Sequence, residues 1–182
     1  MLDLIIKNGK CYIDGELKDI DVAVKDKKIH EIGQISGEAK EIIDASGHTV
    51  LPGCIDTQVH FREPGSTDTE DLHSGSRAAI VGGITSVFEM PNTNPPTSNK
   101  KEFQRKLDLA KNRMFCNYAF YFGATADNSD DLASLKDLEG CCGIKLFAGS
   151  STGNLLVAEE DDIDKVFQNA SKVVAVHSED EA

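Results

Sequence analysis

The chain has 182 residues, 40% of them hydrophobic, which is the length and composition of a globular protein with a buried core. Its apolar runs fall short of the roughly 18 to 20 residues that a membrane span needs, and no signal peptide is recognisable. The formal net charge of -12 repels phosphate backbones and argues against nucleic-acid binding. We therefore expect a cytoplasmic protein that binds neither membranes nor nucleic acid.

Residues 1–50 alternate apolar and polar side chains in short runs, separated by turn signals such as Asn8-Gly9 and Asp14-Gly15. Alternation with a period of two is typical of strands with one buried face, and these dipeptides are typical of tight hairpins. The predicted strands are Leu2–Lys7, Cys11–Ile13, Asp21–Val24 and Lys28–Ile32. The segment predicts a small antiparallel β unit.

From residue 51 onward, unbroken apolar strands alternate with amphipathic segments, which predicts βα units around a parallel sheet. The predicted strands are Val50–Phe61, Thr85–Met90, Cys116–Gly123, Gly143–Ala148 and Val173–His177, and the predicted helices are Asp71–Val81, Lys100–Lys111, Asp130–Leu138 and Asp161–Ala170. A complete (β/α)8 barrel takes about 250 residues. Residues 51–182 are therefore predicted to form the first part of such an α/β barrel, with about five of its strands.

Enzymes on this barrel place their catalytic residues at the carboxyl ends of the strands. The first strand ends within the polar segment 56–65, which reads DTQVHFREPG. Side chains two positions apart on a strand share a face. Four polar side chains are therefore predicted to point together into the barrel, namely those of Asp56, Gln58, His60 and Arg62. Such a row is costly to bury unless its members bind one another, a metal or a ligand.

Later strands end in further reactive residues. The second strand runs into a polar loop at Met90–Pro96, the fourth carries Lys145 in an apolar run, and the fifth ends in His177, a nitrogen ligand for metals. Lysine is rarely buried without a partner. Carboxylation of the amine by carbon dioxide would replace a buried ammonium with an anion able to bridge two metal ions. The alternative is a side chain that reaches water at the barrel rim.

Together these segments resemble the dihydroorotases, which are cyclic amidohydrolases. Asp56–Gly65 is similar to their signature D-x-H-x-H-F-R-E-P-G, and Met90–Pro96 matches their loop M-P-N-T-N-P-P. Lys145–Gly153 resembles the strand that carries a carboxylated lysine in many relatives, and Val176–Glu179 resembles the strand with the next metal-binding histidine. Residues 1–50 resemble the N-terminal part of the composite β-sandwich domain of these hydrolases.

The resemblance implies a zinc centre of one or two ions, with His60, carboxylated Lys145 and His177 as metal ligands. It further implies that Arg62 and Asn92 hold the carboxylate of a small-molecule substrate. The reaction would be the reversible cyclisation of N-carbamoyl-L-aspartate to (S)-dihydroorotate in pyrimidine biosynthesis. The ring substrates of the related hydantoinases and allantoinases lack that carboxylate.

The chain departs from the family pattern at Gln58, which stands where the family usually has the first histidine of its H-x-H pair. An amide oxygen is a weaker zinc ligand than imidazole, so Gln58 is a candidate for a weak metal ligand. The resemblance also places the general acid/base, an aspartate, beyond residue 182, so that the isolated chain is expected to be inactive.

The partners that the resemblance implies are the remainder of the barrel, further copies of the same protein and aspartate carbamoyltransferase. Two other functions stay open. One is a cyclic amidohydrolase of the hydantoinase or allantoinase type. The other is a non-catalytic dihydroorotase-like subunit that supports aspartate carbamoyltransferase.

Overall fold

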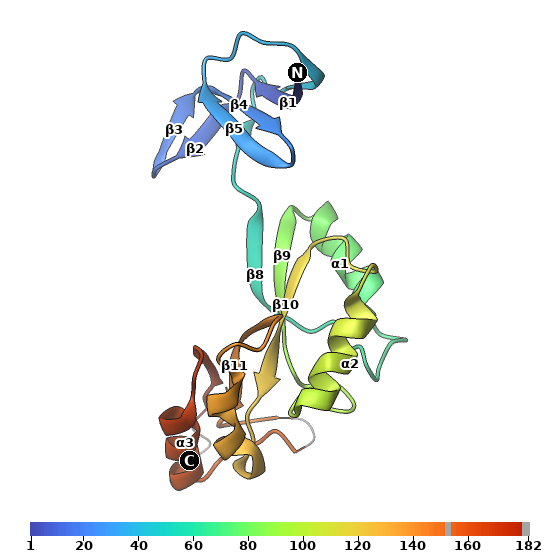
Figure 1. Cartoon of the computed structure of the whole chain (residues 1–182), viewed down its shortest axis with the longest axis vertical. Coiled ribbons are helices and arrows are strands. Elements are labelled where there is room, and N and C mark those ends of the chain that lie inside the picture. The colour runs from blue at the N-terminus through green and yellow to red at the C-terminus, as the bar shows by residue number, and fades with distance from the viewer. Residues whose placement is uncertain (152–153, 180–182) are drawn as a thin grey trace. The chain divides into compact units, whose positions relative to one another are not determined.

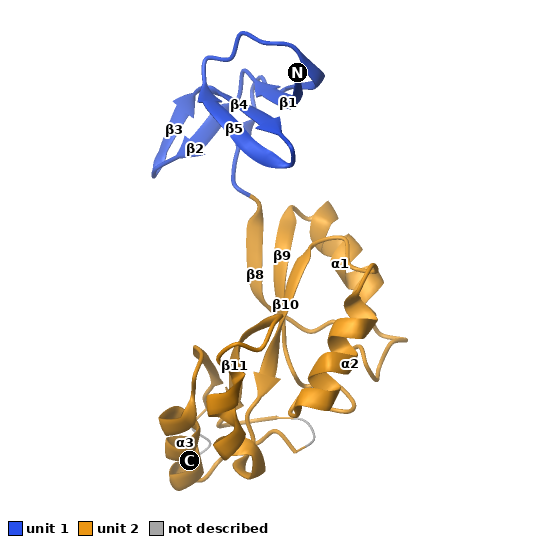
Figure 2. Ribbon diagram, in the orientation of Figure 1, with its two compact units in different colours: residues 1–52 blue, residues 53–182 orange. Residues whose placement is uncertain are grey.

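The computed structural model describes residues 1–151 and 154–179, and it divides the chain into two compact units, residues 1–52 and 53–182 (Figure 2). Each unit has its own sheets and its own hydrophobic core. Within the described residues, no helix has the length and apolar character required to cross a membrane.

The first unit contains two small mixed sheets, with strand orders β5-β4-β1-β6 and β3-β2-β7. Strands β1 to β5 are labelled in Figure 1. Its strands are β1 (Leu2–Lys7), β2 (Lys10–Ile13), β3 (Glu16–Asp19), β4 (Asp21–Lys25), β5 (Lys28–Gly33), β6 (Ala39–Asp44) and β7 (Thr49–Val50). Ile5, Ala23 and Ile35 form the buried core of this unit.

The prediction of an antiparallel unit is correct for three strand pairs and wrong for two. β1 with β4, β4 with β5, and β2 with β3 are antiparallel, whereas β6 joins β1 and β7 joins β2 in parallel. The turn residues Asn8 and Asp14 do have left-handed backbones, with φ of 61° and 54°. Such residues mark reversals between consecutive strands, but they carry no information about pairing between strands that are distant in sequence.

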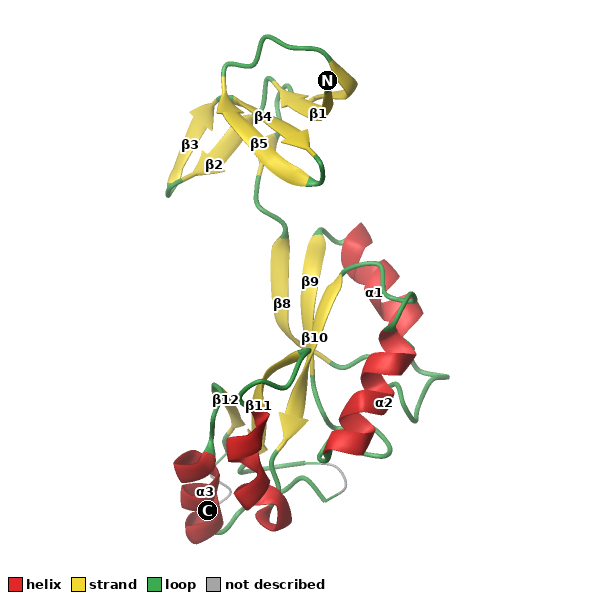
Figure 3. Ribbon diagram, viewed as in Figure 1, coloured by secondary structure: helices red, strands yellow, loops and turns green. Residues whose placement is uncertain are grey.

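The second unit is a five-stranded parallel sheet in the order β12-β11-β10-β9-β8 with helices beside it, which corresponds to about half of a (β/α)8 barrel (Figure 3). Its elements are β8 (Cys54–Val59), α1 (Leu72–Val81), β9 (Ile84–Glu89), α2 (Lys100–Ala110), β10 (Asn117–Gly123), the 3-10 helix η1 (Ala126–Leu135), β11 (Cys141–Phe147), α3 (Glu160–Asn169) and β12 (Val174–His177). The predicted partial barrel is confirmed. The exception is the third helix, predicted as an α-helix over residues 130–138 and found as the 3-10 helix η1.

Side-chain caps fix where α1, α2 and η1 begin. The carboxylate of Asp71 accepts a hydrogen bond from the backbone N–H of Ser74 at the start of α1, and the Asn99 side chain does the same at the start of α2. Each cap satisfies an N–H that has no partner inside the helix. Thr125 caps η1 through the N–H of Asn128. The Asp and Ser residues that follow favour local hydrogen bonds over a regular α-helix, which accounts for the tighter 3-10 form.

Aromatic side chains from α2 and β10 form the centre of the core in the second unit. Phe103 of α2 has no exposed surface. Its ring centroid lies 6.4 Å from that of Phe120 and 6.2 Å from that of Phe122, both on β10. This packing holds α2 against the sheet and so fixes the loop between β9 and α2.

Replacing Phe103 with alanine is expected to destabilise the protein by about 3–5 kcal/mol, because the change leaves a cavity between α2 and the sheet. Urea unfolding measures the difference. Phe115→Ala is the matched control, since the Phe115 side chain is 54% exposed and packs in a T-shaped arrangement with the ring of His73. Its loss is expected to be about 1 kcal/mol or less. Equal losses for the two variants would contradict the assignment of Phe103 to the core.

Candidate active site

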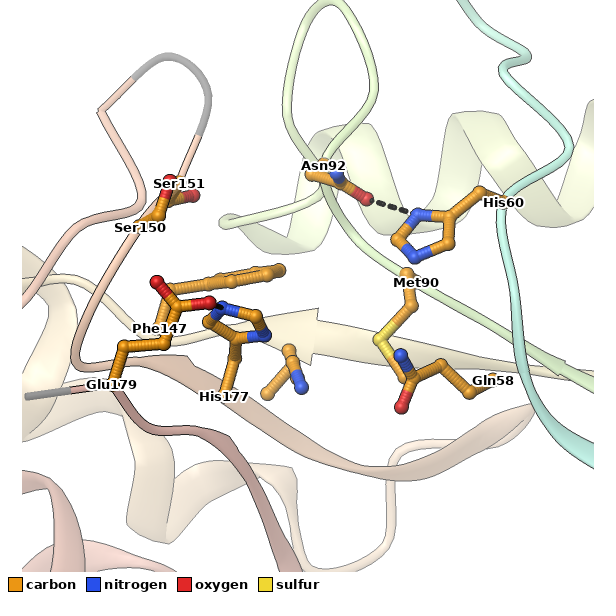
Figure 4. Close-up of a pocket in the computed structure, with 10 residues that line it drawn as sticks. Gln58, His60, Met90, Asn92, Phe147, Ser150, Ser151, His177 and Glu179 are labelled. Atoms are coloured by element: carbon orange, nitrogen blue, oxygen red, sulfur yellow. Dashed lines mark hydrogen bonds and ion pairs between the residues drawn. The ribbon is translucent and has the colours of Figure 1, made fainter.

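A pocket of about 350 Å³ opens at the carboxyl ends of the strands in the second unit (Figure 4). Five of the six predicted site residues line it, namely Gln58, His60, Asn92, Lys145 and His177. The remaining lining residues were given no role from the sequence; they are Met90, Phe147, Ser150, Ser151 and Glu179. The sixth predicted residue, Arg62, is not part of this lining.

His60 and Asn92 face each other from the ends of β8 and β9 (Figure 4). The Nδ1 atom of His60 lies 2.8 Å from Oδ1 of Asn92. Because an amide oxygen can only accept a hydrogen bond, Nδ1 carries the proton and the lone pair of Nε2 stays free for a metal. Burial is the main cause that lowers the pKa of His60, while the hydrogen bond to Asn92 raises it. The net lowering keeps the imidazole neutral at pH 7, as metal binding requires.

His177 stands at the end of β12 with Glu179 beside it (Figure 4). Its Nε2 atom lies 3.0 Å from Oε1 of Glu179. A carboxylate accepts, so Nε2 is the donor and the lone pair of Nδ1 is free. Carboxylates in this position commonly orient histidines that bind metals. The sequence analysis gave Glu179 no role, although its spacing of two residues from a candidate ligand was a usable signal.

Lys145 lies inside β11, between Gly123 of β10 and Ala175 of β12 in the sheet register. The residue is 3% exposed, and its Nζ atom lies 5.0 Å from the ring centroid of Phe147. Burial lowers the pKa of the amine, and no acidic side chain among the described residues raises it. A larger fraction of neutral amine follows, which is the form that reacts with carbon dioxide. Thr152 and Gly153, the last two residues of the motif that begins at Lys145, lie outside the described residues.

The predicted row of four polar side chains on the first barrel strand is not continuous. β8 ends at Val59, and its pairing with β9 is irregular between Asp56 and Val59. The Asp56 carboxylate accepts a hydrogen bond from the backbone N–H of Gln58, at 2.9 Å. Arg62 lies in the following loop with a left-handed φ of 50°. Of this row, only Gln58 and His60 line the pocket, because alternation between faces holds only within a regular strand.

Glu63 fixes the loop that carries Arg62. The buried Glu63 carboxylate accepts two hydrogen bonds from the Arg113 guanidinium, at 2.7 and 3.1 Å, and one from the backbone N–H of Leu72, at 2.9 Å. Arg62 is half-buried, and its guanidinium has no hydrogen-bond or ion-pair partner among the described residues. The loop is therefore anchored through Glu63, and the side chain of Arg62 remains available for a ligand.

The set of donor atoms fits a metal ion if Lys145 contributes an oxygen ligand. Among residues 1–151 and 154–179, no three His, Cys, Asp or Glu side chains lie close enough to hold a metal. His60 and His177 nevertheless bring free nitrogen lone pairs to the pocket that contains the Lys145 amine and the Gln58 amide. A carboxylated Lys145 would add an anionic oxygen, and zinc accepts nitrogen and oxygen ligands together.

A parallel βα half-barrel with two histidines and a buried lysine at its carboxyl-terminal face is the arrangement of the N-terminal half of a (β/α)8 barrel with a polar site at that face. The sequence profile of the Amidohydrolase family matches residues 49–177, and the chain belongs to this family. The family prediction made from the sequence motifs is confirmed at this level.

Known relatives have three related activities. An allantoinase from Escherichia coli is 42% identical over 149 residues, which is 81% of this chain and 33% of that enzyme. A dihydroorotase from Methanosarcina mazei is 35% identical over 185 residues, which is 100% of this chain and 40% of that enzyme. The solved structure of an L-hydantoinase (dihydropyrimidinase) from Arthrobacter aurescens superposes with a TM-score of 0.90 at 31% identity, covering 100% of this chain and 42% of the hydantoinase.

The chain is therefore related to the metal-dependent cyclic amidohydrolases, and its relatives act on different ring substrates. The chain spans 33% of the length of the allantoinase and 40% of that of the dihydroorotase.

Replacing Asn92 with alanine is expected to lower the pKa of His60 further. The hydrogen bond from Nδ1 to Asn92 favours the protonated ring, so its loss leaves burial and the nearby positive charges to act without opposition. An NMR pH titration of the His60 ring in metal-free protein measures the shift. Asn117→Ala, at the opposite end of the sheet, is the control and should leave the value unchanged. A His60 pKa that rises in Asn92→Ala would contradict the assigned hydrogen bond.

Proposed function

We propose that the chain is part of a dihydroorotase, an enzyme that interconverts N-carbamoyl-L-aspartate and (S)-dihydroorotate. The observation that carries the proposal is the half-buried guanidinium of Arg62, which forms no hydrogen bond or ion pair with an acidic side chain among the described residues. Dihydroorotate carries a carboxylate, and a guanidinium fork binds a carboxylate through two parallel hydrogen bonds.

The charge of the chain gives this observation its weight. The chain has 31 acidic residues and only 19 lysines and arginines. Most basic side chains near the surface can therefore pair with a carboxylate. Arg113 does so, binding Glu63 through both terminal nitrogens. Arg62 forms no such ion pair among the described residues, although its charge contributes to lowering the pKa of His60 and that of the buried Glu89 carboxyl, and so lies close to the pocket. A guanidinium whose hydrogen-bond donors are unused among the described residues is suited to an anionic ligand.

Asn92 supports the same role. Its Oδ1 atom is occupied by His60, so the amide nitrogen is the end that remains to donate a hydrogen bond. Arg62 and Asn92 would hold the substrate carboxylate from two neighbouring loops, after β8 and after β9. Binding the carboxylate at two points orients the ring and presents its amide to the pocket lined by the two histidines.

Three other pocket residues, His60, His177 and Lys145, are suited to bind zinc. His60 offers Nε2 and His177 offers Nδ1. The neutral amine of Lys145 would attack carbon dioxide, form an N–C bond and release a proton, which leaves an anionic carbamate as the third ligand. When bound, zinc supplies Lewis-acid polarisation of the ring carbonyl and a water of lowered pKa. The aspartate that would transfer the proton is expected outside this chain.

A second candidate function is that of an allantoinase or hydantoinase. The higher identity to the Escherichia coli allantoinase, 42%, and the structural similarity to the hydantoinase favour it. Neither ring substrate carries the carboxylate that an arginine at position 62 would bind. Arg62 therefore distinguishes the two proposals.

Arg62→Ala in the full-length enzyme is expected to reduce kcat/KM for dihydroorotate by roughly 100-fold. Two hydrogen bonds to a charged group are lost, each contributing about 1.5–3 kcal/mol, with partial replacement by water. Steady-state ring opening, with allantoin and hydantoin as comparison substrates, measures the effect. Arg105→Ala, on the exposed face of α2, is the control and should leave turnover unchanged.

Two results would count against the dihydroorotase proposal. One is an unmodified enzyme that turns over allantoin or hydantoin faster than dihydroorotate. The other is an Arg62→Ala variant with undiminished activity on dihydroorotate, which would also remove Arg62 from the substrate site.

Gln58 is expected to weaken one metal position selectively. It lines the pocket beside His60 and replaces an imidazole by an amide oxygen, which is a weaker zinc ligand. At limiting zinc the enzyme should hold about one ion per subunit, and Gln58→His should move it toward about two. Metal analysis after dialysis measures both, with Gln168→His on α3 as the matched control. Retention of two ions by the unmodified enzyme through prolonged chelation would contradict this expectation.

A further inference from the structure

The buried ion pair of Glu89 and Lys106 has no role in the chemistry proposed above. Glu89 is the last residue of β9, and Lys106 lies in the middle of α2. Both side chains are fully buried, and the Lys106 ammonium contacts the Glu89 carboxylate. Burial raises the pKa of Glu89 to about 7 and lowers that of Lys106, while each charge favours the ionised form of the other.

Lys106 also fixes the backbone that leads to Asn92. Its Nζ atom donates a hydrogen bond to the carbonyl oxygen of Met90, at 3.0 Å. The next carbonyl, that of Pro91, accepts the backbone N–H groups of Thr93 and Thr97, each at 2.9 Å. Asn92 is therefore held in a short closed loop whose first residue is bound by the buried ammonium.

The same pair lies next to the end of β8. The backbone N–H of Met90, which directly follows Glu89, donates to the carbonyl oxygen of Val59, at 3.0 Å, and His60 is the next residue. The Phe61 backbone N–H also favours the ionised form of Glu89. Glu89 and Lys106 thus support the backbone on both sides of the hydrogen bond between His60 and Asn92.

We propose that the buried Glu89–Lys106 ion pair positions the metal ligand His60. It holds the backbone at Met90 so that Asn92 keeps the His60 ring in one orientation and one tautomer, with Nε2 free. Neither Glu89 nor Lys106 touches metal or substrate, so both are positioning residues. This role rests on the proposed metal centre.

Stability alone does not account for a pair of this kind. Removing two charges from water is costly, and replacing a buried ion pair by neutral side chains of similar size is often neutral for folding. The contact with Glu89 does, however, hold the Lys106 ammonium in the place from which it donates its hydrogen bond to the carbonyl oxygen of Met90. Residues that orient a metal ligand typically change metal affinity by 10- to 100-fold when they are replaced.

The test neutralises both charges at once in the full-length protein, as Glu89→Gln with Lys106→Met, so that no unpaired charge stays buried. Cobalt(II) is the probe, titrated into metal-free protein and followed by its visible absorption. The dissociation constant is expected to rise 10- to 100-fold. Neutralising the partly exposed pair on the same helix, as Glu102→Gln with Arg105→Met, is the matched control and should leave the dissociation constant unchanged.

A second readout needs no metal. In metal-free protein labelled with 15N-histidine, NMR should show His60 protonated at Nδ1. The neutralised pair should weaken that tautomer preference, as should Asn92→Ala. In an Asn92→Ala background the neutralised pair should reduce cobalt affinity little further, because both changes break the same connection. A merely structural role would instead give additive effects.

Glu89→Asp keeps both charges and shortens the side chain by one methylene, so it should give an intermediate loss of affinity. Unchanged cobalt affinity and tautomer in a folded variant, or full additivity with Asn92→Ala, would overturn the proposal. Loss of folding by both variants would overturn it as well, because the pair would then be a requirement of the fold. If the unmodified protein binds no cobalt, the metal centre itself is wrong, and the tautomer comparison still decides the positioning role.

Discussion

The parallel pairing of β8 to β12 is the constraint on which the candidate site depends. Because all five strands run the same way, their carboxyl ends meet at one edge, and residues far apart in sequence share one pocket. The strand register places Lys145 level with Gly123 of β10 and Ala175 of β12, near the carboxyl ends of all three strands. His60 directly follows β8 and His177 ends β12, the two outer strands of the sheet, and Lys145 lies on β11 between them.

Much of the site could be predicted because its residues break the pattern of the strands that carry them. His60, Lys145 and His177 each interrupt or end an apolar run, and five of six predicted residues do line one pocket. Arg62 was misplaced on the face of a strand, because an irregular pairing and a left-handed residue end the alternation after Val59.

The supporting ion pairs were missed for a different reason. Arg113 and Glu63 are 50 residues apart, and nothing in either local segment indicates the other. The position of Lys106 was a usable signal in the sequence, because its helical spacing puts it on the same buried face of α2 as Phe103 and Ala110. A lysine at that spacing predicts a buried partner. In the first unit, likewise, Asp14-Gly15 marked the hairpin of β2 and β3, but Asn8-Gly9 joins β1 and β2, which lie in different sheets. Local turn signals also could not predict the parallel pairing of β6 and β7.

The left-handed backbone conformation of Arg62 lowers the stability of the folded protein. A left-handed φ of 50° is unfavourable for a residue with a Cβ atom by roughly 1–2 kcal/mol, and glycine or asparagine would relieve it. The loop itself is anchored by Glu63, so such a replacement would leave the backbone in place. Replacing Arg62 with glycine would therefore stabilise the fold but remove the guanidinium, so that position 62 exchanges stability against ligand binding.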